Sequence, residues 1–229
     1  MSHHYISFKD VRFSYPDGHE ALRGVSFRIT HGEKVALLGL NGAGKFTLLL
    51  HTNGLLLPSS GEVNVGDVPV CKKTLKIVRR SVGMVFQNPD DQLFMPTVAE
   101  DVAFGPRNME LPEEEIERRV ASALDSVGCG ALRDKSPAHL SGGQKRSVSI
   151  ATVLAMEPDI LVMDEPTAGL DYVARRQVMD IVSVFDHTCL IATHDIDLAR
   201  ELCPRSLLLD NGEITADGDT EYVVKHFLH

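Results

Sequence analysis

Apolar and polar residues alternate in two stretches near the N-terminus. The first, YISFKDVRFSY, covers residues 5–15, and the second, ALRGVSFRIT, covers residues 21–30. The segment between them, PDGHE, combines proline, aspartate and glycine and is typical of a turn. We therefore expect antiparallel β structure over this region, because alternation predicts strands with one buried face. The segments 59–70 and 81–87 are predicted as a hairpin and a strand in the same way.

Short and almost continuous apolar runs recur further along the chain. They lie at residues 34–39, 159–166, 188–195 and 206–214. Runs of this length are typical of strands buried on both faces. Helical patterns separate them, at residues 45–54, 173–185 and 196–203. Strands that alternate with helices predict an α/β fold with a parallel sheet.

The middle of the chain has a different pattern. Residues 88–108 carry three prolines and one glycine, and we expect them to be irregular. In residues 111–128, apolar side chains recur every three or four positions, acids fill the first turn and a glycine ends the pattern, which predicts a helix. Residues 142–157 predict a second helix. We expect a single domain over residues 1–229, with a helical subdomain at approximately 90–157.

Composition narrows the class of protein. The chain has 229 residues, of which 43% are apolar, and a net charge of -9, so nucleic-acid binding is not expected. Its four cysteines show no CxxC spacing, which favours buried free thiols in a reducing cytosol. No apolar run approaches the ~18 residues that span a bilayer. The pair His3 and His4 is interpreted as a solvated tail.

A glycine-rich loop follows the first buried run. It comprises Gly39, Leu40, Asn41, Gly42, Ala43, Gly44, Lys45, Phe46 and Thr47. Glycines at this spacing let successive backbone N–H groups point at phosphate oxygens, and a lysine at the start of a helix neutralises them. The sequence therefore predicts a phosphate-binding loop; the alternative is a plain glycine turn between a strand and a helix.

Two adjacent carboxylates end the second buried run. Asp164 can hold Mg²⁺ through water, and Glu165 can orient or deprotonate the water that attacks a γ-phosphate. The alternative is an acid that caps the following helix.

The segment LSGGQKR begins the second predicted helix of the middle region. Ser141 and Gln144 have the spacing of a capping box. Gly142 and Gly143 are not explained by capping, because two glycines weaken a helix start by about 1 kcal/mol each. A close approach to a second phosphate is the interpretation that accounts for them.

The order of five segments resembles the ATP-binding subunit of ABC transporters. These segments are the glycine-rich loop, LSGGQ, ILVMDEP, GLD at 169–171 and THD at 193–195. The resemblance covers the whole chain. It implies a P-loop NTPase fold of the ABC type, with a parallel-sheet core, an N-terminal antiparallel β subdomain and an inserted helical subdomain. It also implies ATP and Mg²⁺ as cofactors, and two subunits paired head to tail. Each ATP is then held by one loop and by Ser141 and Gly143 of the other subunit.

The resemblance also implies individual roles. Gln87 resembles the glutamine that contacts Mg²⁺ and senses the membrane partner, and His194 the histidine that contacts the γ-phosphate. Asp171 resembles a residue of the dimer interface. Tyr15 resembles the aromatic residue that stacks on adenine, although taken alone it is a half-buried strand residue.

The segment VFQNPDDQLFMPTVAEDVAFGP is similar to energy-coupling-factor ATPases. These pair with a transmembrane coupling protein and a substrate-capturing membrane protein, on the cytoplasmic face of the cell membrane. The short C-terminal segment resembles cobalt and nickel importers of the CbiO type, and vitamin import is the alternative. Two further hypotheses remain open: a non-transport ABC ATPase, and a nucleotide clamp that dimerises without hydrolysis.

Phe46 departs from the family, which has Ser or Thr at this position to bind Mg²⁺. A phenyl ring offers no lone pair, and Thr47 points about 100 degrees further around the helix. If the misplaced metal costs about 3 kcal/mol of transition-state stabilisation, hydrolysis falls on the order of a hundredfold while binding persists. Three explanations compete: a natural degenerate site, a change from Ser, and a tolerated substitution with rearranged metal coordination.

Overall fold

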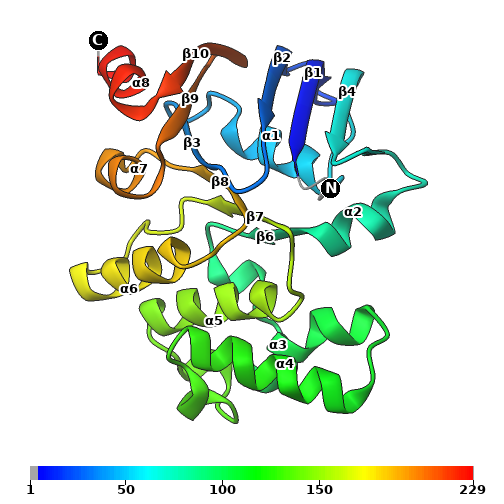
Figure 1. Cartoon of the computed structure of the whole chain (residues 1–229), viewed down its shortest axis with the longest axis vertical. Coiled ribbons are helices and arrows are strands. Elements are labelled where there is room, and N and C mark those ends of the chain that lie inside the picture. Colours follow the sequence, from blue (N-terminus) through cyan, green and yellow to red (C-terminus); the bar gives the residue numbers. More distant parts are fainter. Residues whose placement is uncertain (1–4, 229) are drawn as a thin grey trace. The chain divides into compact units, whose positions relative to one another are not determined.

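A computed structural model describes residues 5–228, so the pair His3 and His4 lies outside the described residues. Backbone contacts divide the chain into two compact units. The first contains the chain up to Met84, Asp159–Glu165 and the chain from Asp186 onward, and the second contains Val85–Pro158 and Pro166–Phe185. Figure 1 draws both units and labels their elements.

The N-terminal part of the first unit is a four-stranded sheet with strand order β2-β1-β4-β5. Its strands are β1 (Ile6–Ser14), β2 (Glu20–Ile29), β4 (Ser60–Val65) and β5 (Val68–Pro69). All of its pairs are antiparallel, which confirms the predicted β structure and hairpin. Phe8 and Phe27 are directly opposed, and their rings stack with centroids 4.6 Å apart on the buried face.

A six-stranded sheet follows, with strand order β10-β9-β3-β8-β7-β6. Its strands are β3 (Lys34–Leu38), β6 (Val82–Val85), β7 (Ile160–Asp164), β8 (Thr188–Ala192), β9 (Arg205–Asp210) and β10 (Glu213–Asp219). The pairs β3–β8, β3–β9 and β7–β8 are parallel, as predicted. These central strands are buried on both faces, which explains their continuous apolar runs.

One strand prediction is wrong. The run 206–214 is not a single strand but an antiparallel hairpin of β9 and β10. Asn211 and Gly212 have φ angles of 47° and 81°, as a two-residue turn of this type requires. The dipeptide Asn-Gly in this run carried the signal for the turn.

The helices of the first unit are α1 (Lys45–Thr52), α2 (Leu75–Ser81), α7 (Ile196–Leu202) and α8 (Thr220–Phe227). Helices α1 and α7 confirm predictions. Helix α2 was not predicted, because it spans seven residues and buries only Val78, which leaves no periodic pattern. Helix α8 was not predicted either, although Asp219 caps it through the N–H of Glu221.

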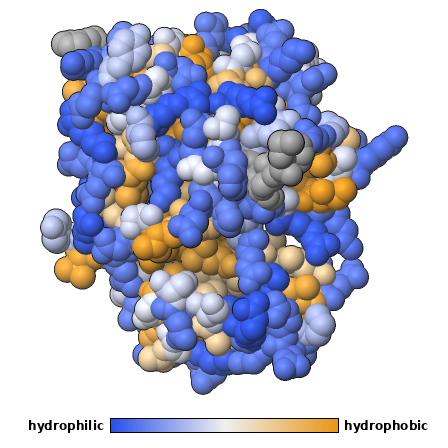
Figure 2. Space-filling view, in the orientation of Figure 1, coloured by the Kyte–Doolittle hydropathy of each residue, from blue (hydrophilic) through white to orange (hydrophobic). Residues whose placement is uncertain are grey.

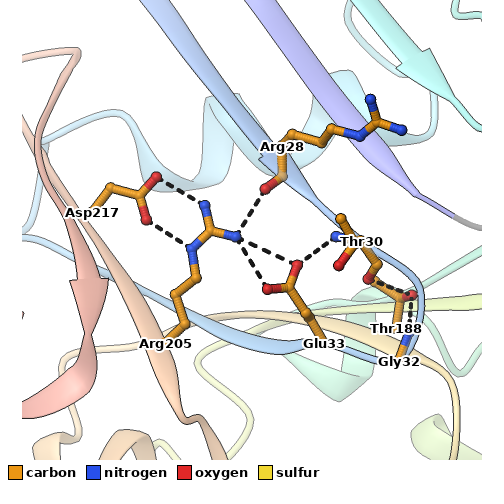
Figure 3. Close-up of polar contacts among 7 residues, drawn as sticks. All are labelled: Arg28, Thr30, Gly32, Glu33, Thr188, Arg205 and Asp217. Carbon is orange, nitrogen blue, oxygen red and sulfur yellow. Dashed lines mark hydrogen bonds and ion pairs between the residues drawn. The ribbon is translucent and has the colours of Figure 1, made fainter.

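Arg205 ties the turn after β2 to the β9–β10 hairpin (Figure 3). Its guanidinium pairs with both carboxylate oxygens of Asp217, at 2.7 and 2.8 Å. It also donates to the carbonyl of Arg28 and to the carboxylate of Glu33. Burial alone would raise the pKa of Glu33, but hydrogen bonds from Thr30 and Arg205 bring its pKa below the usual value.

The second unit is helical. Its helices are α3 (Val98–Asn108), α4 (Glu113–Ser126), α5 (Gly142–Leu154) and α6 (Tyr172–Ser183), with short 3-10 turns at Pro89–Asp91, Gly130–Leu132 and Pro137–His139. Helices α4, α5 and α6 confirm predictions. The irregular structure predicted for 88–108 is wrong over α3, which begins with a capping box between Thr97 and Glu100. Gly105 and Pro106 lie in its last turns, where Pro106 donates no backbone hydrogen bond and Gly105 leaves room for Met156.

The cysteines behave as predicted. All four are free thiols, and three of them are buried. Burial raises the pKa of Cys189 and of Cys203 to about 12, so both thiols stay protonated and inert. Among the helices of the described residues, none is both long enough and apolar enough to cross a membrane.

Candidate nucleotide site

The glycine-rich loop joins β3 to α1 in the first unit. Gly44 is the N-cap of α1 and has a φ of 104°; no side chain caps the helix. A Cβ at Gly44 would lie 2.6 Å from the carbonyl oxygen of Ala21, so only glycine fits there. At Gly42 a Cβ would meet nothing within 4 Å, so the loop is open on that side. The N-terminus of α1 is therefore left to an anion from outside, as phosphate binding requires.

Lys45 lies inside the loop. Its side chain is 8% exposed, and Nζ donates to the carbonyl oxygens of Gly39 at 2.7 Å and Leu40 at 3.2 Å. Nζ also lies 4.0 Å from a carboxylate oxygen of Glu165. Burial lowers the pKa of Lys45, while the charges of Glu165 and Asp164 act in the opposite direction. The ammonium group of Lys45 is therefore held where an entering phosphate could replace the carbonyl oxygens as its hydrogen-bond partner.

Asp164 and Glu165 lie at the carboxyl edge of the parallel sheet, and both are buried. Glu165 has a φ of 43°, an uncommon backbone for a side chain of this size. Its N–H donates to the carbonyl of Ala192 at the end of the neighbouring strand. Since β7 and β8 are parallel, their ends bring Glu165 next to the segment that contains Thr193 and His194.

Glu165 and His194 are in direct contact. The Nδ1 atom of His194 lies 2.9 Å from Oε2 of Glu165, which also accepts from Thr193 Oγ1 at 3.2 Å and from the His194 N–H at 3.3 Å. The side chain of His194 is 64% exposed, whereas that of Glu165 is 8% exposed. The carboxylate is thus oriented by three donors beside Lys45, with a solvent-facing imidazole attached to it.

Tyr15 lies against the start of α1. Its hydroxyl is 2.9 Å from Oγ1 of Thr47, and its ring makes an edge contact with Phe13. The ring of His19 is nearly parallel to that of Tyr15, with centroids 6.4 Å apart. The Thr47 hydroxyl therefore has a partner inside the protein, and Tyr15 is fixed next to the loop.

His51 was missed by the sequence reasoning. It is fully buried one turn after Thr47, whose carbonyl oxygen lies 2.7 Å from its Nδ1, and it makes an edge contact with Phe13. Burial lowers the pKa of His51, so the imidazole is neutral in the folded chain at neutral pH. Its position inside the apolar pattern of α1 was the signal that could have indicated burial.

Phe46 is 45% exposed and brings no ligand atom. Residues 5–228 contain no cluster of three or more His, Cys, Asp or Glu side chains placed to share a metal ion. The loop and Lys45 fit the phosphates of a nucleotide. A magnesium ion would depend on phosphate oxygens and on carboxylates such as Asp164, as is common for this ion.

The second unit contains the remaining predicted residues. Ser141 caps α5 by accepting from the N–H of Gln144, whose side chain accepts from the Ser141 N–H, so the capping box is confirmed. A Cβ at Gly143 would lie 2.7 Å from Cβ of Ala174, so close packing of α5 on α6 explains this glycine. A Cβ at Gly142 would meet nothing within 4 Å, so packing does not explain that one.

Gln87 lies close to the LSGGQ segment within the same unit. Both face a surface hollow of about 530 Å³, whose lining includes Gln87, Gly142, Lys145 and Gly169. Arg146 is buried and donates to the carbonyl oxygens of Phe86 and Gln87, which fixes the backbone there. The sequence reasoning missed this arginine, although it directly follows LSGGQK. Asp171 caps α6 by accepting from the N–H of Ala174.

Comparisons with known proteins agree with this arrangement. The family model described as ABC transporter matches residues 22–168. A protein of Geobacter sulfurreducens named as an ABC transporter ATP-binding protein is 60% identical over 96% of this chain and 88% of its own length. The energy-coupling factor transporter ATP-binding protein EcfA of Methanocaldococcus jannaschii is 49% identical over 95% of this chain and 80% of its own length.

Two solved structures share the fold. CbiO1 of Clostridium perfringens, described as part of the ABC transporter complex cbiONQ, superposes with a TM-score of 0.86 and 41% identity over 96% of this chain and 90% of its own. A dimeric ATP-binding cassette bound to ADP and Pi has a TM-score of 0.84 and 29% identity over 94% of this chain and 98% of its own. This chain therefore belongs to the ABC transporter family, as an ATP-binding subunit with a P-loop NTPase fold that uses ATP and Mg²⁺.

Proposed function

We propose that this chain is the ATP-hydrolysing motor subunit of a membrane importer of the energy-coupling-factor type. It would act as a head-to-tail dimer on the cytoplasmic face of the cell membrane, with a transmembrane coupling protein and a substrate-capturing membrane protein. The similarity to EcfA and to CbiO1 supports this assignment. The observation that carries the ATPase activity is the convergence of Lys45, Glu165 and His194 at the end of the parallel sheet.

The proposed roles follow from this geometry. The N–H groups of residues 39–47 and Lys45 bind the phosphates. Glu165, buried and in contact with His194, would orient the attacking water, and the exposed His194 would contact the γ-phosphate. Tyr15 would contact the adenine. Mg²⁺ bound with ATP would neutralise charge on the phosphates, with Asp164 and Gln87 as its protein contacts.

Ser141, Gly142, Gly143 and Gln144 would serve the ATP of the other subunit. The open surface at Gly142 supports a backbone contact there. We further propose that residues 1–229 form one ABC ATPase domain, with residues of approximately 90–157 as its helical subdomain.

For the cargo we propose cobalt or nickel ions, with a vitamin as the alternative. The similarity to CbiO1 supports the first. The cargo would be selected by the membrane proteins, so mass spectrometry of the native complex is the measurement that identifies it.

Phe46 supports a second candidate function, a nucleotide clamp that dimerises on ATP with little hydrolysis. The ring offers no lone pair to Mg²⁺, and the neighbouring Thr47 hydroxyl already pairs with Tyr15. We propose that turnover in this chain is reduced on the order of a hundredfold, which corresponds to about 3 kcal/mol of transition-state stabilisation.

The test compares Phe46→Ser with Phe46→Ala in the complex purified with its native membrane partners. Ser restores an oxygen ligand, whereas Ala only removes the bulk of the ring. We expect Mg²⁺-dependent phosphate release to rise on the order of a hundredfold in Phe46→Ser and much less in Phe46→Ala.

Other outcomes discriminate the candidates. Equal rates in the parent and both variants, all of them fast, would show that Phe46 does not impair turnover. ATP-driven dimerisation without phosphate release, even in Phe46→Ser, would favour the clamp over the motor.

A further inference from the structure

A basic segment interrupts this acidic chain. Five of the nine residues from Lys72 to Arg80 are Lys or Arg, and no Asp or Glu occurs between Asp67 and Asp90. The chain as a whole has 23 Lys and Arg against 32 Asp and Glu. The segment therefore concentrates positive charge on α2 and the residues just before it, which lie in the first unit (Figure 1).

Helix α2 directs this charge outward. Val78 is its one fully buried side chain, whereas Lys73, Lys76 and Arg80 are exposed. Residues three and four apart lie on one helix face, so Lys76 and Arg80 share a face with Ile77. Ile77 is 56% exposed, although it is strongly apolar. Around α2, at the right of the view, Figure 2 shows hydrophilic residues beside a small apolar patch.

Arg79, on another side of α2, ties the helix to the end of α1. Its Nε donates to the carbonyl of Asn53 at 3.2 Å and its Nη2 to the carbonyl of Gly54 at 3.3 Å. The next residue, Leu55, is 48% exposed. We call this region the α2 basic surface. It consists of Lys72, Lys73, Lys76, Arg79, Arg80, Ile77 and Leu55.

Most of this charge is not neutralised by the chain itself. Within residues 5–228, no carboxylate lies within ion-pair distance of Lys72, Lys73, Arg79 or Arg80. Arginines elsewhere behave differently: Arg118 and Arg119 of α4 each pair with Glu115 at 2.7 Å. Lys72, Lys73 and Arg80 are therefore available to an external anion.

We propose that the α2 basic surface docks on anionic phospholipid headgroups, with Ile77 and Leu55 reaching the boundary of the acyl chains. Basic side chains beside exposed apolar ones are typical of such contacts, which combine electrostatic attraction with apolar burial. A protein partner is less well matched, because lysine is depleted in protein interfaces and three of the five basic residues are lysines. The lipid contact goes beyond the proposed function and adds to the attachment by membrane partners.

Sedimentation with vesicles tests this contact on the purified, nucleotide-free chain. The probes are vesicles of phosphatidylcholine alone and vesicles with roughly one third phosphatidylglycerol. We expect binding to the anionic vesicles only, and loss of binding as salt rises. Each basic residue near such a surface strengthens binding about fivefold, so Lys72→Gln/Lys73→Gln/Arg80→Gln should weaken it on the order of a hundredfold.

A matched control removes the same charge elsewhere. Lys9, Lys135 and Lys225 are also exposed, and Lys9→Gln/Lys135→Gln/Lys225→Gln lowers the net charge equally. We expect this variant to bind anionic vesicles almost as the parent does. Ile77→Ser should lower the share of binding that survives high salt. Unchanged melting temperatures show that the variants are folded.

Equal weakening in the two triple variants would overturn the proposal, because it would trace binding to net charge alone. No preference for anionic vesicles would overturn it as well. If vesicles do not bind but the α2 triple variant is lost from membranes that contain the transporter partners, the surface belongs to a protein contact. These assays contain no ATP, so their failure is distinct from a failure of the ATPase proposal.

Discussion

His51 shows how a single residue couples the start of α1 to pH. The imidazole is fully buried, with Nδ1 at 2.7 Å from the carbonyl of Thr47 and the Phe13 ring against its edge. Burial disfavours the charged form and lowers the pKa of His51 below its ordinary value of 6.5. His51 thus has a lower pKa in the folded chain than in the unfolded chain. At a pH between these two values, the unfolded chain binds a proton that the folded chain does not.

We therefore expect His51 to make the folded chain less stable as the pH falls below about 6.5, by up to about 1.4 kcal/mol per pH unit. Above that pH, its contribution is constant. Denaturation midpoints in urea at pH 7.5 and 5.5 measure the effect, and His51→Gln should make the pH dependence shallower. The matched control is His226→Gln on α8, which replaces an exposed histidine instead of a buried one. An unchanged slope in His51→Gln would contradict this account.

At the scale of elements, the contact between α5 and α6 depends on Gly143. Its missing side chain leaves room for Ala174, whose Cβ would lie only 2.7 Å from an added Cβ. Gly142, one residue earlier, has no neighbour within 4 Å of that position. Of the two adjacent glycines at the start of α5, helix packing thus requires Gly143 but not Gly142.

This difference predicts opposite effects of the same substitution. Gly143→Ala should destabilise the chain by about 1–3 kcal/mol, as overpacking does, whereas Gly142→Ala should be neutral or stabilise it by up to about 1 kcal/mol through helix propensity. Adding Ala174→Gly to Gly143→Ala should restore much of the lost stability, because it removes the opposing methyl group. Chemical denaturation measures all three. A Gly143→Ala variant as stable as the parent would show that α6 moves away at no cost.

Elements with a complete local pattern could be predicted from the sequence. Helix α4 has its acids, periodic apolar residues and terminal glycine within residues 111–128, and the β3-loop-α1 unit is contiguous along the chain. Helix α3 could not be predicted in this way. Its Gly105 and Pro106 read as breaks, and the helix persists because Thr97 and Glu100 cap its start and Gly105 admits Met156.

The candidate site also has a part that the sequence predicts and a part that it does not. The residues of the loop are neighbours along the chain, so their grouping follows from the sequence alone. Other contacts in the site join segments that are distant along the chain. They pair Glu165 with His194, Tyr15 with Thr47, and Arg146 with the carbonyl of Gln87. Such pairs depend on strand order and helix packing, which a periodic pattern does not specify.

For the whole molecule, the melting temperature measures nucleotide binding separately from hydrolysis. A ligand that binds only the folded chain at one hundred times its Kd stabilises it by about 2.7 kcal/mol. For a chain of this length, that raises Tm by roughly 5–10 °C. In the proposed site, the loop and Lys45 would bind phosphate without a metal, so we expect most of this shift with ATP and a chelator.

Magnesium then distinguishes the parent from Phe46→Ser. In the parent, added Mg²⁺ should raise Tm little beyond the effect of ATP, because position 46 supplies no ligand. In Phe46→Ser, the same addition should raise Tm further, because the hydroxyl binds the metal together with the phosphates. Lys45→Met should abolish the shift in either background. If the parent shows a shift only when Mg²⁺ is present, the ion is well held despite Phe46, and the reduced turnover proposed for this chain loses its physical basis.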